Sequence, residues 1–225
     1  MDYKKLLKIA SFDPMWLQPP PAWVGHMPFA YWLMQEIKPI IMVELGTHSG
    51  NSYFSFCQSV FENKLMTSCY AVDTWKGDAH SGSYDEDVFE KVLRHNQKYP
   101  FSTLMRSTFD DAVSSFEDKS IDVLHIDGLH TYEAVKHDFE TWQPKLSMSA
   151  VVLFHDTQVK HLDFGVWKFW EELKQTGYPN MDFHHCNGLG VIAGWGYDWL
   201  HSPELIGYFT ALGLHQMERY EAKIP

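Results

Sequence analysis

The chain has 225 residues, of which 45% are hydrophobic and 21% are charged, and its formal net charge is −11. This length is sufficient for one sizeable hydrophobic core, and the composition is ordinary for a globular protein. The acidic balance argues against binding to nucleic acid, because a phosphate backbone requires a basic face. No stretch approaches the roughly 20 apolar residues of a membrane-spanning helix, so we expect no membrane span.

The three cysteines, Cys57, Cys69 and Cys186, are far apart in the sequence and form no CxxC pair. This pattern argues against a disulfide scaffold or a zinc knuckle, and it favours a reducing, cytoplasmic setting. The first residues include lysines but no long apolar run behind them, so they do not resemble a secretion signal.

The first 28 residues are rich in proline and aromatic residues and include three consecutive prolines at 19–21. Because proline is excluded from helix interiors, we expect an irregular arm that packs on the domain. A short helix is predicted over 29–37, before Pro39 stops it.

Beyond the arm, apolar strand patterns alternate with helical patterns. The predicted strands are 40–45, 68–73, 101–106, 121–127 and 150–154. The predicted helices are 51–61, 85–99, 109–116, 131–142 and 166–176. The segments 181–186 and 190–193 predict a closing hairpin around the turn dipeptide Asn187–Gly188, and a last helix is predicted near 203–212.

This alternation predicts an α/β fold, with a mostly parallel sheet of seven strands and helices on both faces. We expect 1–39 to form an N-terminal arm and helix, 40–195 the main domain, and 196–225 a C-terminal tail. Ligands of such sheets bind beyond the carboxyl ends of the strands. The residues that follow each strand therefore form the candidate site.

The first predicted strand ends in a glycine loop with the sequence ELGTHSG over 44–50. The glycines let a ligand approach the backbone, and Ser49 can cap the next helix, whose amides favour a carboxylate or phosphate. The spacing E-x-G-x-x-x-G differs from the dinucleotide pattern G-x-G-x-x-G and lacks the Gly-Lys-Ser/Thr of a P-loop, so NAD and ATP fit less well. Asp73 ends the second strand, where an acid can accept hydrogen bonds from ribose hydroxyls.

The glycine loop followed by Asp73 resembles the cofactor-binding signature of class I S-adenosylmethionine (SAM)-dependent methyltransferases, and it implies their Rossmann-like fold. In that family the glycines approach the methionine part of SAM and the acid holds the ribose, while Glu44 would hold the loop or the amino group. Trp75 either stacks near the adenosine or anchors the core. The predicted cofactor-binding residues are Glu44, Gly46, Ser49, Gly50, Asp73, Trp75 and Asp127. Alternatively, the glycines only make a tight turn and Asp73 is a solvated strand end.

Acids and histidines follow two further strands. Asp127 and His130 come after the fourth strand, and His155 and Asp156 come at the end of the fifth. These strand ends are neighbours in a parallel sheet, so the four side chains should converge beside the SAM site. Two carboxylates with imidazoles suit a divalent cation, and a histidine also suits general base chemistry.

The pattern I-D-G-x-H-x-Y-x-x-V-x-x-D, followed by F-H-D-T, resembles the metal-dependent sugar O-methyltransferases of macrolide biosynthesis and related surface-glycan enzymes. The similarity covers about 40–176. It implies that Asp127 and Asp156 hold Mg²⁺ and that His130 is the base, with Asp127 also part of the catalytic set. His155 is the third predicted ligand, at a position that is acidic in some relatives. Alternatively, Asp127 caps the following helix and Asp156 only makes a turn.

The predicted function is that of a SAM-dependent O-methyltransferase of glycan biosynthesis. A divalent metal would orient a hydroxyl of a sugar or glycan acceptor, and His130 would remove its proton. The alternatives are a phenolic or other small-metabolite acceptor, and a non-catalytic SAM-fold module of a glycan-assembly protein. An NAD-dependent oxidoreductase is disfavoured by the glycine spacing.

Two further expectations concern the surroundings of this site. The polar loop after Asp73, within 74–99, is expected to act as a lid. His80 in this loop faces either the acceptor or solvent, and solvent is the expected position of a lone loop histidine. Relatives of this kind often assemble, so a homo-oligomer is a candidate state.

Overall fold

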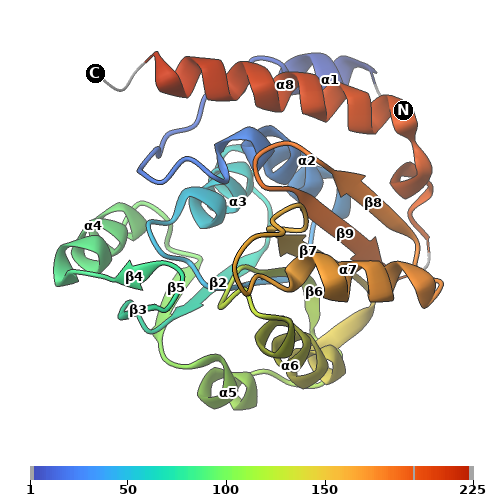
Figure 1. The fold of residues 1–225 in the computed structure, drawn as a ribbon. Helices are drawn as coiled ribbons and strands as arrows, with labels where there is room; N and C mark the ends of the chain where they lie inside the picture. Colours follow the sequence, from blue (N-terminus) through green and yellow to red (C-terminus); the bar gives the residue numbers. More distant parts are fainter. Residues whose placement is uncertain (1–2, 195, 223–225) are drawn as a thin grey trace.

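The computed structural model describes residues 3–194 and 196–222, and its centre is a seven-stranded sheet. The strand order is β5-β2-β1-β6-β7-β9-β8 (Figure 1). The strands are β1 (Ile41–Leu45), β2 (Ser68–Asp73), β5 (Ser102–Arg106), β6 (Ile121–Ile126), β7 (Leu146–His155), β8 (Asn180–Phe183) and β9 (Leu189–Ala193). The first five run parallel, whereas β9 lies antiparallel between β7 and β8. The predicted mostly parallel α/β sheet and its closing hairpin are confirmed.

The central strands are mostly apolar because both faces of the sheet are covered. In β7, Val151 and Leu153 belong to the hydrophobic cluster on one face. The alternate residues Val152 and Phe154 belong to the cluster on the other face. The side chains of residues 150–154 alternate between two buried faces, which explains the continuous apolar run in this part of β7.

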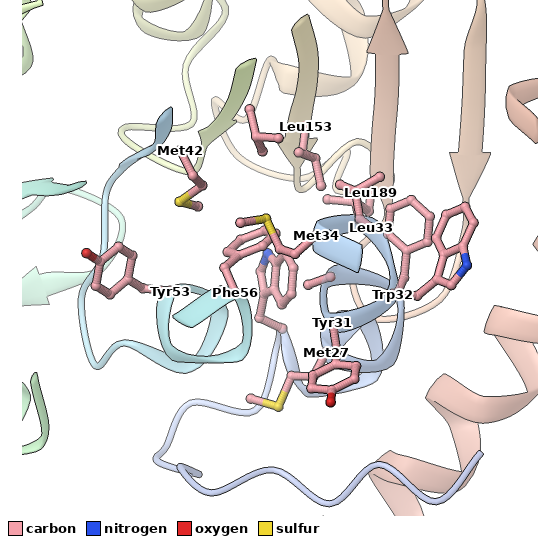
Figure 2. Packing of buried hydrophobic residues seen from close by; sticks show 14 of the residues in the cluster. Met27, Tyr31, Trp32, Leu33, Met34, Met42, Tyr53, Phe56, Leu153 and Leu189 are labelled. Atoms are coloured by element: carbon pink, nitrogen blue, oxygen red, sulfur yellow. The ribbon is translucent and has the colours of Figure 1, made fainter. Parts of the chain in front are cut away.

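The first face is covered by helices from the first hundred residues and by the C-terminal helix (Figure 1). These are α1 (Tyr3–Ile9), α2 (Met27–Ile37), α3 (Asn51–Asn63), α4 (Glu86–Asn96) and α8 (Pro203–Glu221), with short 3-10 helices at Val24–His26 and Asp198–His201. Figure 2 shows how side chains of α2, such as Leu33 and Met34, pack toward Met42 of β1 and Leu153 of β7. The arm and the C-terminal helix therefore belong to the core.

The second face is covered by helices from the middle of the chain. They are α5 (Phe109–Ala112), α6 (Tyr132–Trp142) and α7 (Val166–Gln175), with 3-10 turns at Val113–Ser115 and Gln143–Lys145. Thr131 caps α6, because its side chain accepts a hydrogen bond from the Ala134 amide at 3.2 Å. Asp127 is thus not the cap of this helix and faces the site instead.

The helix α1 lies in the arm that the sequence analysis predicted to be irregular. Leu6 and Ile9 are 6% and 1% exposed, and the Leu6 carbonyl accepts a hydrogen bond from the Tyr208 hydroxyl of α8. A helix of seven residues is too short to be stable by itself, so tertiary packing stabilises it. No local pattern could have predicted that contact.

The helix α8 continues to Glu221, beyond the predicted end near 212. Gly213 does not end the helix. A Cβ at this position would lie 2.3 Å from the Gly25 carbonyl oxygen and 2.5 Å from His185 Nε2. This glycine therefore serves a close approach between α8 and the arm.

Two smaller differences complete the comparison. β7 begins at Leu146, four residues before the predicted strand, and the loop after Asp73 contains a small hairpin, β3 (Gly77–Asp78) with β4 (Gly82–Ser83). Within 3–194 and 196–222, none of the helices has the length and apolar character needed to cross a membrane.

Candidate functional site

The turns after β1, β2, β6 and β7 open into two adjoining hollows at the carboxyl edge of the sheet. We call them the Phe109 lobe, of about 450 Å³, and the His130 lobe, of about 430 Å³. The residues that line both lobes are Gly46, His48, Asp78, Tyr84 and Asp127. The common crevice predicted from the strand ends is therefore present.

The glycine loop passes directly over the turn that follows β6. Gly46 has φ +89°, and a Cβ there would lie 2.1 Å from the Asp127 carbonyl oxygen. Only glycine permits both the left-handed backbone and this contact. Gly50, with φ +84°, precedes α3, and a Cβ there would lie 2.7 Å from the ring of Phe54.

Asp73 closes the glycine loop through backbone amides. Its Oδ2 accepts hydrogen bonds from the amides of Thr47 at 2.9 Å and His48 at 2.8 Å, and its Oδ1 accepts one from the Trp75 amide at 2.6 Å. The carboxylate also lines the Phe109 lobe. Asp73 is thus not a solvated strand end, because its carboxylate is buried and bonded to the backbone of the loop.

Trp75 supports this loop from below. Its side chain is 1% exposed, lies against Phe89, and donates a hydrogen bond from the indole N–H to the His48 carbonyl at 3.0 Å. Trp75 is not among the described residues that line the two lobes. The structure gives it the core-anchoring position, the second of the two roles that the sequence left open.

Glu44 lies beneath the site in a buried row with His125 and Trp23. His125 Nδ1 is 2.8 Å from Glu44 Oε2, and the Trp23 indole N–H points at His125 Nε2 at 3.1 Å. An indole N–H only donates, so His125 Nε2 accepts and Nδ1–H donates to Glu44. Burial raises the pKa of Glu44, whereas the contact with His125 lowers it. Glu44 is not among the described residues that line the two lobes. Its position is consistent with a residue that supports the glycine loop.

The predicted acid and histidine cluster is assembled at the floor of the His130 lobe. His130 Nε2 is 2.9 Å from Asp156 Oδ2 and 3.6 Å from Asp127 Oδ1. His155 Nδ1 is 3.2 Å from Asp127 Oδ1 and 3.5 Å from Asp156 Oδ2. One ligand atom each from Asp127, His130 and Asp156 lies within 4.8 Å of the others. The expected convergence of these side chains is present.

Charge balance within the cluster follows from these distances. Burial alone would lower the pKa of His130, but Asp127 and Asp156 outweigh it and raise the pKa to about 9. Burial would also lower the pKa of His155, but the same two carboxylates raise it well above its usual value. Burial would raise the pKa values of Asp127 and Asp156, yet the imidazoles hold both well below the usual range. Two carboxylates thus face two imidazolium groups.

The backbone orients His155 within the cluster. Its Nε2 lies 3.1 Å from the Cys186 carbonyl oxygen, which can only accept, so Nε2 carries a proton and Nδ1 faces the carboxylates. Cys186 has φ +50° in the turn after β8, although the sequence predicted it as the last residue of the strand 181–186. Metal-ligating histidines typically donate a hydrogen bond to a carbonyl oxygen from the ring nitrogen that does not bind the metal.

The prediction that His80 faces solvent is wrong. Its side chain is 6% exposed, and its Nδ1 lies 3.2 Å from His130 Nδ1. Its ring stacks on Phe164 with centroids 4.5 Å apart. The polar loop after β2 places His80 in the wall of the His130 lobe, the alternative position that the sequence left open. No local pattern distinguishes it from a solvated histidine.

The N-terminal arm completes the wall of the His130 lobe. The Trp16 indole N–H donates to the Ser49 carbonyl at 2.8 Å, and the Asn51 side chain donates to the carbonyls of Gln18 at 2.6 Å and Pro20 at 3.0 Å. These bonds attach the arm to the start of α3. The arm residues that line the lobe are Pro20, Ala22 and Trp23. The sequence predicted that the arm packs on the domain, but no local pattern indicated this contribution to the site.

Comparison with known proteins gives a family match and a curated relative. A family model described as a methyltransferase domain matches residues 43–157. The uncharacterized protein y4gI of Sinorhizobium fredii is 49% identical over 192 residues, which are 85% of this chain and 21% of that protein. The chain thus spans about a fifth of the length of this relative.

Solved structures share the fold at low sequence identity. A Staphylococcus aureus protein assigned as a caffeoyl-CoA O-methyltransferase has a TM-score of 0.59 at 15% identity, covering 86% of this chain and 92% of the other. The methyltransferase PaMTH1 of Podospora anserina, bound to S-adenosylhomocysteine (SAH), has a TM-score of 0.57 at 13% identity, covering 86% and 88%. The O-methyltransferase TomG of Streptomyces achromogenes, in complex with SAM, has a TM-score of 0.55 at 13% identity, covering 86% and 90%. The Rossmann-like fold expected from the sequence is confirmed.

Proposed function

Because the chain belongs to the methyltransferase-domain family and has the class I fold of SAM-dependent methyltransferases, we propose that it moves the methyl group of SAM to a hydroxyl group. The observation that carries this proposal is the convergence of Asp127, His130 and Asp156 beside the glycine loop. The acceptor hydroxyl would bind at these residues together with a divalent metal, and His130 would act as the base.

The Phe109 lobe is the better place for SAM. It combines the glycine loop with Asp73 and with the ring of Phe109, which offers an apolar face to an adenine. Asp73 Oδ1 accepts a single hydrogen bond from a backbone amide, so a lone pair is left for a ribose hydroxyl. That TomG and PaMTH1 hold SAM and SAH supports this cofactor type. The shared wall at Gly46 and Asp127 would direct the methyl group toward the His130 lobe.

The donor set of the cluster fits a divalent metal. Asp156 Oδ1 is buried and has no hydrogen-bond partner within the described part of the chain. With Asp127 and Asp156 supplying carboxylates and His155 supplying Nδ1, the set suits Mg²⁺ or the somewhat softer Mn²⁺. When bound, such an ion lowers the pKa of a coordinated hydroxyl and orients it. It would take over the charge compensation that the two imidazoles provide in this structure.

In this scheme His130 removes the proton of the acceptor hydroxyl at Nε2. That atom already lies among the carboxylates, within reach of a group bound to them. The methyl transfer itself is a displacement at the methyl carbon, in which the oxygen enters as the sulfur leaves. Positioning of the two reactants would supply much of the rate gain.

A sugar or glycan hydroxyl is the acceptor that the His130 lobe favours. Its polar side chains, suited to several hydroxyl groups, are Ser49, Ser52, Ser81 and Asn187. The ring of Phe164 adds flat apolar surface, on which a sugar face can stack. A phenolic acceptor would use this ring but leave many of these polar groups unpaired.

The test is methyl transfer from labelled SAM to a panel of sugars, sugar nucleotides, glycans and catechols, with Mg²⁺, with Mn²⁺ and with excess chelator. We expect product with a sugar-containing acceptor, and loss of turnover with chelator or in Asp156→Asn. Full activity in chelator would contradict the proposed metal requirement, and a preference for catechols would contradict the proposed sugar acceptor. SAM binding by calorimetry without transfer to any acceptor would instead favour the non-catalytic module.

The setting of the protein stays a prediction. Cys57, Cys69 and Cys186 are free thiols, which supports the proposed cytoplasmic compartment. Light scattering would test the proposed homo-oligomer. The full-length relative y4gI would show how such a domain is arranged within a longer protein.

A further inference from the structure

The wall that the Phe109 lobe and the His130 lobe share includes two residues of one hairpin, Asp78 and Tyr84. They belong to residues 76–84, which we call the Asp78 hairpin and which contain β3 and β4. In the proposed function, SAM lies in one lobe and the acceptor in the other. The sulfonium of SAM, from which the methyl group leaves, would then lie at this shared wall.

The carboxylate of Asp78 is held in place by the backbone of its own turn. Its Oδ1 accepts hydrogen bonds from the amides of His80 at 2.7 Å and Ser81 at 2.8 Å, and the Asp78 amide donates to the Ser81 hydroxyl at 3.2 Å. Within the described part of the chain, Oδ2 has no hydrogen-bond partner. The turn thus fixes one oxygen and leaves the other available to a ligand.

A stacked pair of rings attaches the Asp78 hairpin to the glycine loop. Tyr84 lies on the ring of His48, with centroids 4.2 Å apart and an interplanar angle of 19°. The Tyr84 amide donates to the Lys76 carbonyl at 3.3 Å and closes the hairpin, while the His48 amide donates to Asp73 at 2.8 Å. The hairpin is therefore anchored at the junction of the two lobes.

The charge at this junction is negative. Among the described residues, neither Lys nor Arg lines either lobe. Asp127 has imidazoles as partners, whereas Asp78 forms no ion pair within the described part of the chain. Burial raises the pKa of the Tyr84 hydroxyl to about 12. A hydrogen bond with Ser81 opposes this rise, and three carboxylates add to it: Asp73, Asp78 and Asp127.

We propose that Asp78 is a specificity-determining residue that recognises the positive charge of the sulfonium and so distinguishes SAM from its neutral product SAH. This inference rests on the proposed function. A carboxylate in a cleft attracts a nearby cation more strongly than one in bulk water, because the effective dielectric constant is lower. The Asp78 hairpin would hold this carboxylate against the cofactor through the stack on His48.

The reaction removes the charge that Asp78 would recognise. The bond between the methyl carbon and the sulfur breaks, and its electron pair stays on the sulfur. The acceptor oxygen forms the new bond to the methyl carbon, and its proton goes to His130 as in the proposed function. The sulfur is then a neutral thioether, so the attraction to Asp78 disappears. The same residue thereby favours binding of SAM and release of SAH.

Asp78→Asn tests the charge without removing the turn, because the amide oxygen can still accept from the amides of His80 and Ser81. By calorimetry, we expect the Kd of SAM to rise about 10-fold and the Kd of SAH to change less than about twofold. Sinefungin, which carries an ammonium group in place of the methylsulfonium, should behave like SAM. The matched control is Asp87→Asn on α4, the same charge change at a side chain that is 62% exposed. It should change each affinity less than about twofold.

Two variants test the stack that holds the hairpin. Tyr84→Phe keeps an aromatic ring on His48, so the ratio of the SAH Kd to the SAM Kd should be retained. Tyr84→Leu removes the aromatic pair and should lower this ratio about threefold. An equal loss in both variants would contradict the positioning of Asp78 by the stack.

Turnover separates charge recognition from a part in the chemistry. In Asp78→Asn, KM for SAM should rise about 10-fold while kcat falls less than about threefold, as for a contact that contributes mainly to ground-state binding. A loss of kcat of about 100-fold, the size of a general base contribution, would overturn the proposal. Equal losses of SAM and SAH affinity would also overturn it, because they would place Asp78 at a group that both ligands share.

The wild type distinguishes failure of this inference from failure of the proposed function. If the wild type does not bind SAM, the proposed function is wrong and this inference falls with it. If the wild type binds SAM and transfers its methyl group, but Asp78→Asn leaves the ratio of the SAH Kd to the SAM Kd unchanged, only the role of Asp78 is wrong.

Discussion

The Phe109 lobe is held together mainly by backbone groups, whereas the His130 lobe is held together by side chains from segments far apart in the sequence. In the first, loop amides of Thr47 and His48 bind Asp73, and Gly46 lies against the Asp127 carbonyl. In the second, His80 meets His130 across 50 positions of sequence. Changes in the first lobe should therefore act on folding and SAM binding, and changes in the second on the acceptor step.

The largest expected effect is on the acceptor step alone. His130→Ala should lower kcat by about 10³-fold or more, since general base catalysis supplies 10²–10⁴, while SAM affinity stays within about twofold. Turnover with labelled SAM and calorimetry with SAM measure the two effects separately. Parallel loss of SAM affinity and kcat would show that the lobes are not independent, and unchanged kcat would remove His130 as the base.

The buried carboxyl of Asp138, close to Gly128 in the wall of the Phe109 lobe, should make the free energy of unfolding depend on pH. Asp138 is 7% exposed and lies beneath Gly128, and burial raises its pKa to about 7. The folded carboxyl therefore keeps its proton at pH values where the unfolded one has lost it. Its stabilising contribution is complete below about pH 4 and is lost as pH rises to about 7.

Asp138→Asn removes this titration without changing side-chain size. At pH 8 the variant should be more stable than the wild type by up to roughly 4 kcal/mol, since three pKa units correspond to that free energy. The difference should shrink toward pH 4. Urea unfolding across this range measures it, and a difference that does not vary with pH would contradict the assignment.

Gly46→Ala should disturb both lobes through the backbone they share. The new Cβ would meet the Asp127 carbonyl oxygen at 2.1 Å, at φ +89°. We expect a loss of about 3 kcal/mol in the free energy of unfolding, from left-handed strain and overpacking together. Gly82→Ala is the matched control, since Gly82 has φ +77° but nothing within 4 Å of a Cβ. It should cost only about 1 kcal/mol, and equal losses would refute the close-approach explanation.

The smallest effect should appear at the arm. Trp16→Phe removes the hydrogen bond to the Ser49 carbonyl, worth about 1 kcal/mol. Acceptor KM should rise about fivefold, because the arm lines the His130 lobe, with little change in SAM affinity. Trp199→Phe is the control, since its indole N–H is buried without a partner in the described part of the chain. A larger effect on SAM than on the acceptor would reverse the assignment of the arm.

Much of the sheet and the inner site could be predicted from the sequence. Apolar runs ending in Asp73, Asp127 and Asp156 fix strands whose carboxyl ends must share an edge, since parallel pairing leaves no other arrangement. The convergence of His130 and His155 with the acids follows from the same rule. These features depend on local periodicity and on the geometry of a parallel sheet, which are both readable along the chain.

Tertiary structure alone decided the features that depend on contacts between distant segments. The burial of His80, the position of Trp75 beneath the glycine loop, and the Cys186 carbonyl that orients His155 leave no local signal. The helix α1 forms because α8 covers it, and Gly213 lies inside α8 because the arm approaches there. Local pattern specifies which side chains reach the edge of the sheet, whereas packing between remote segments specifies which way they face and what they bind.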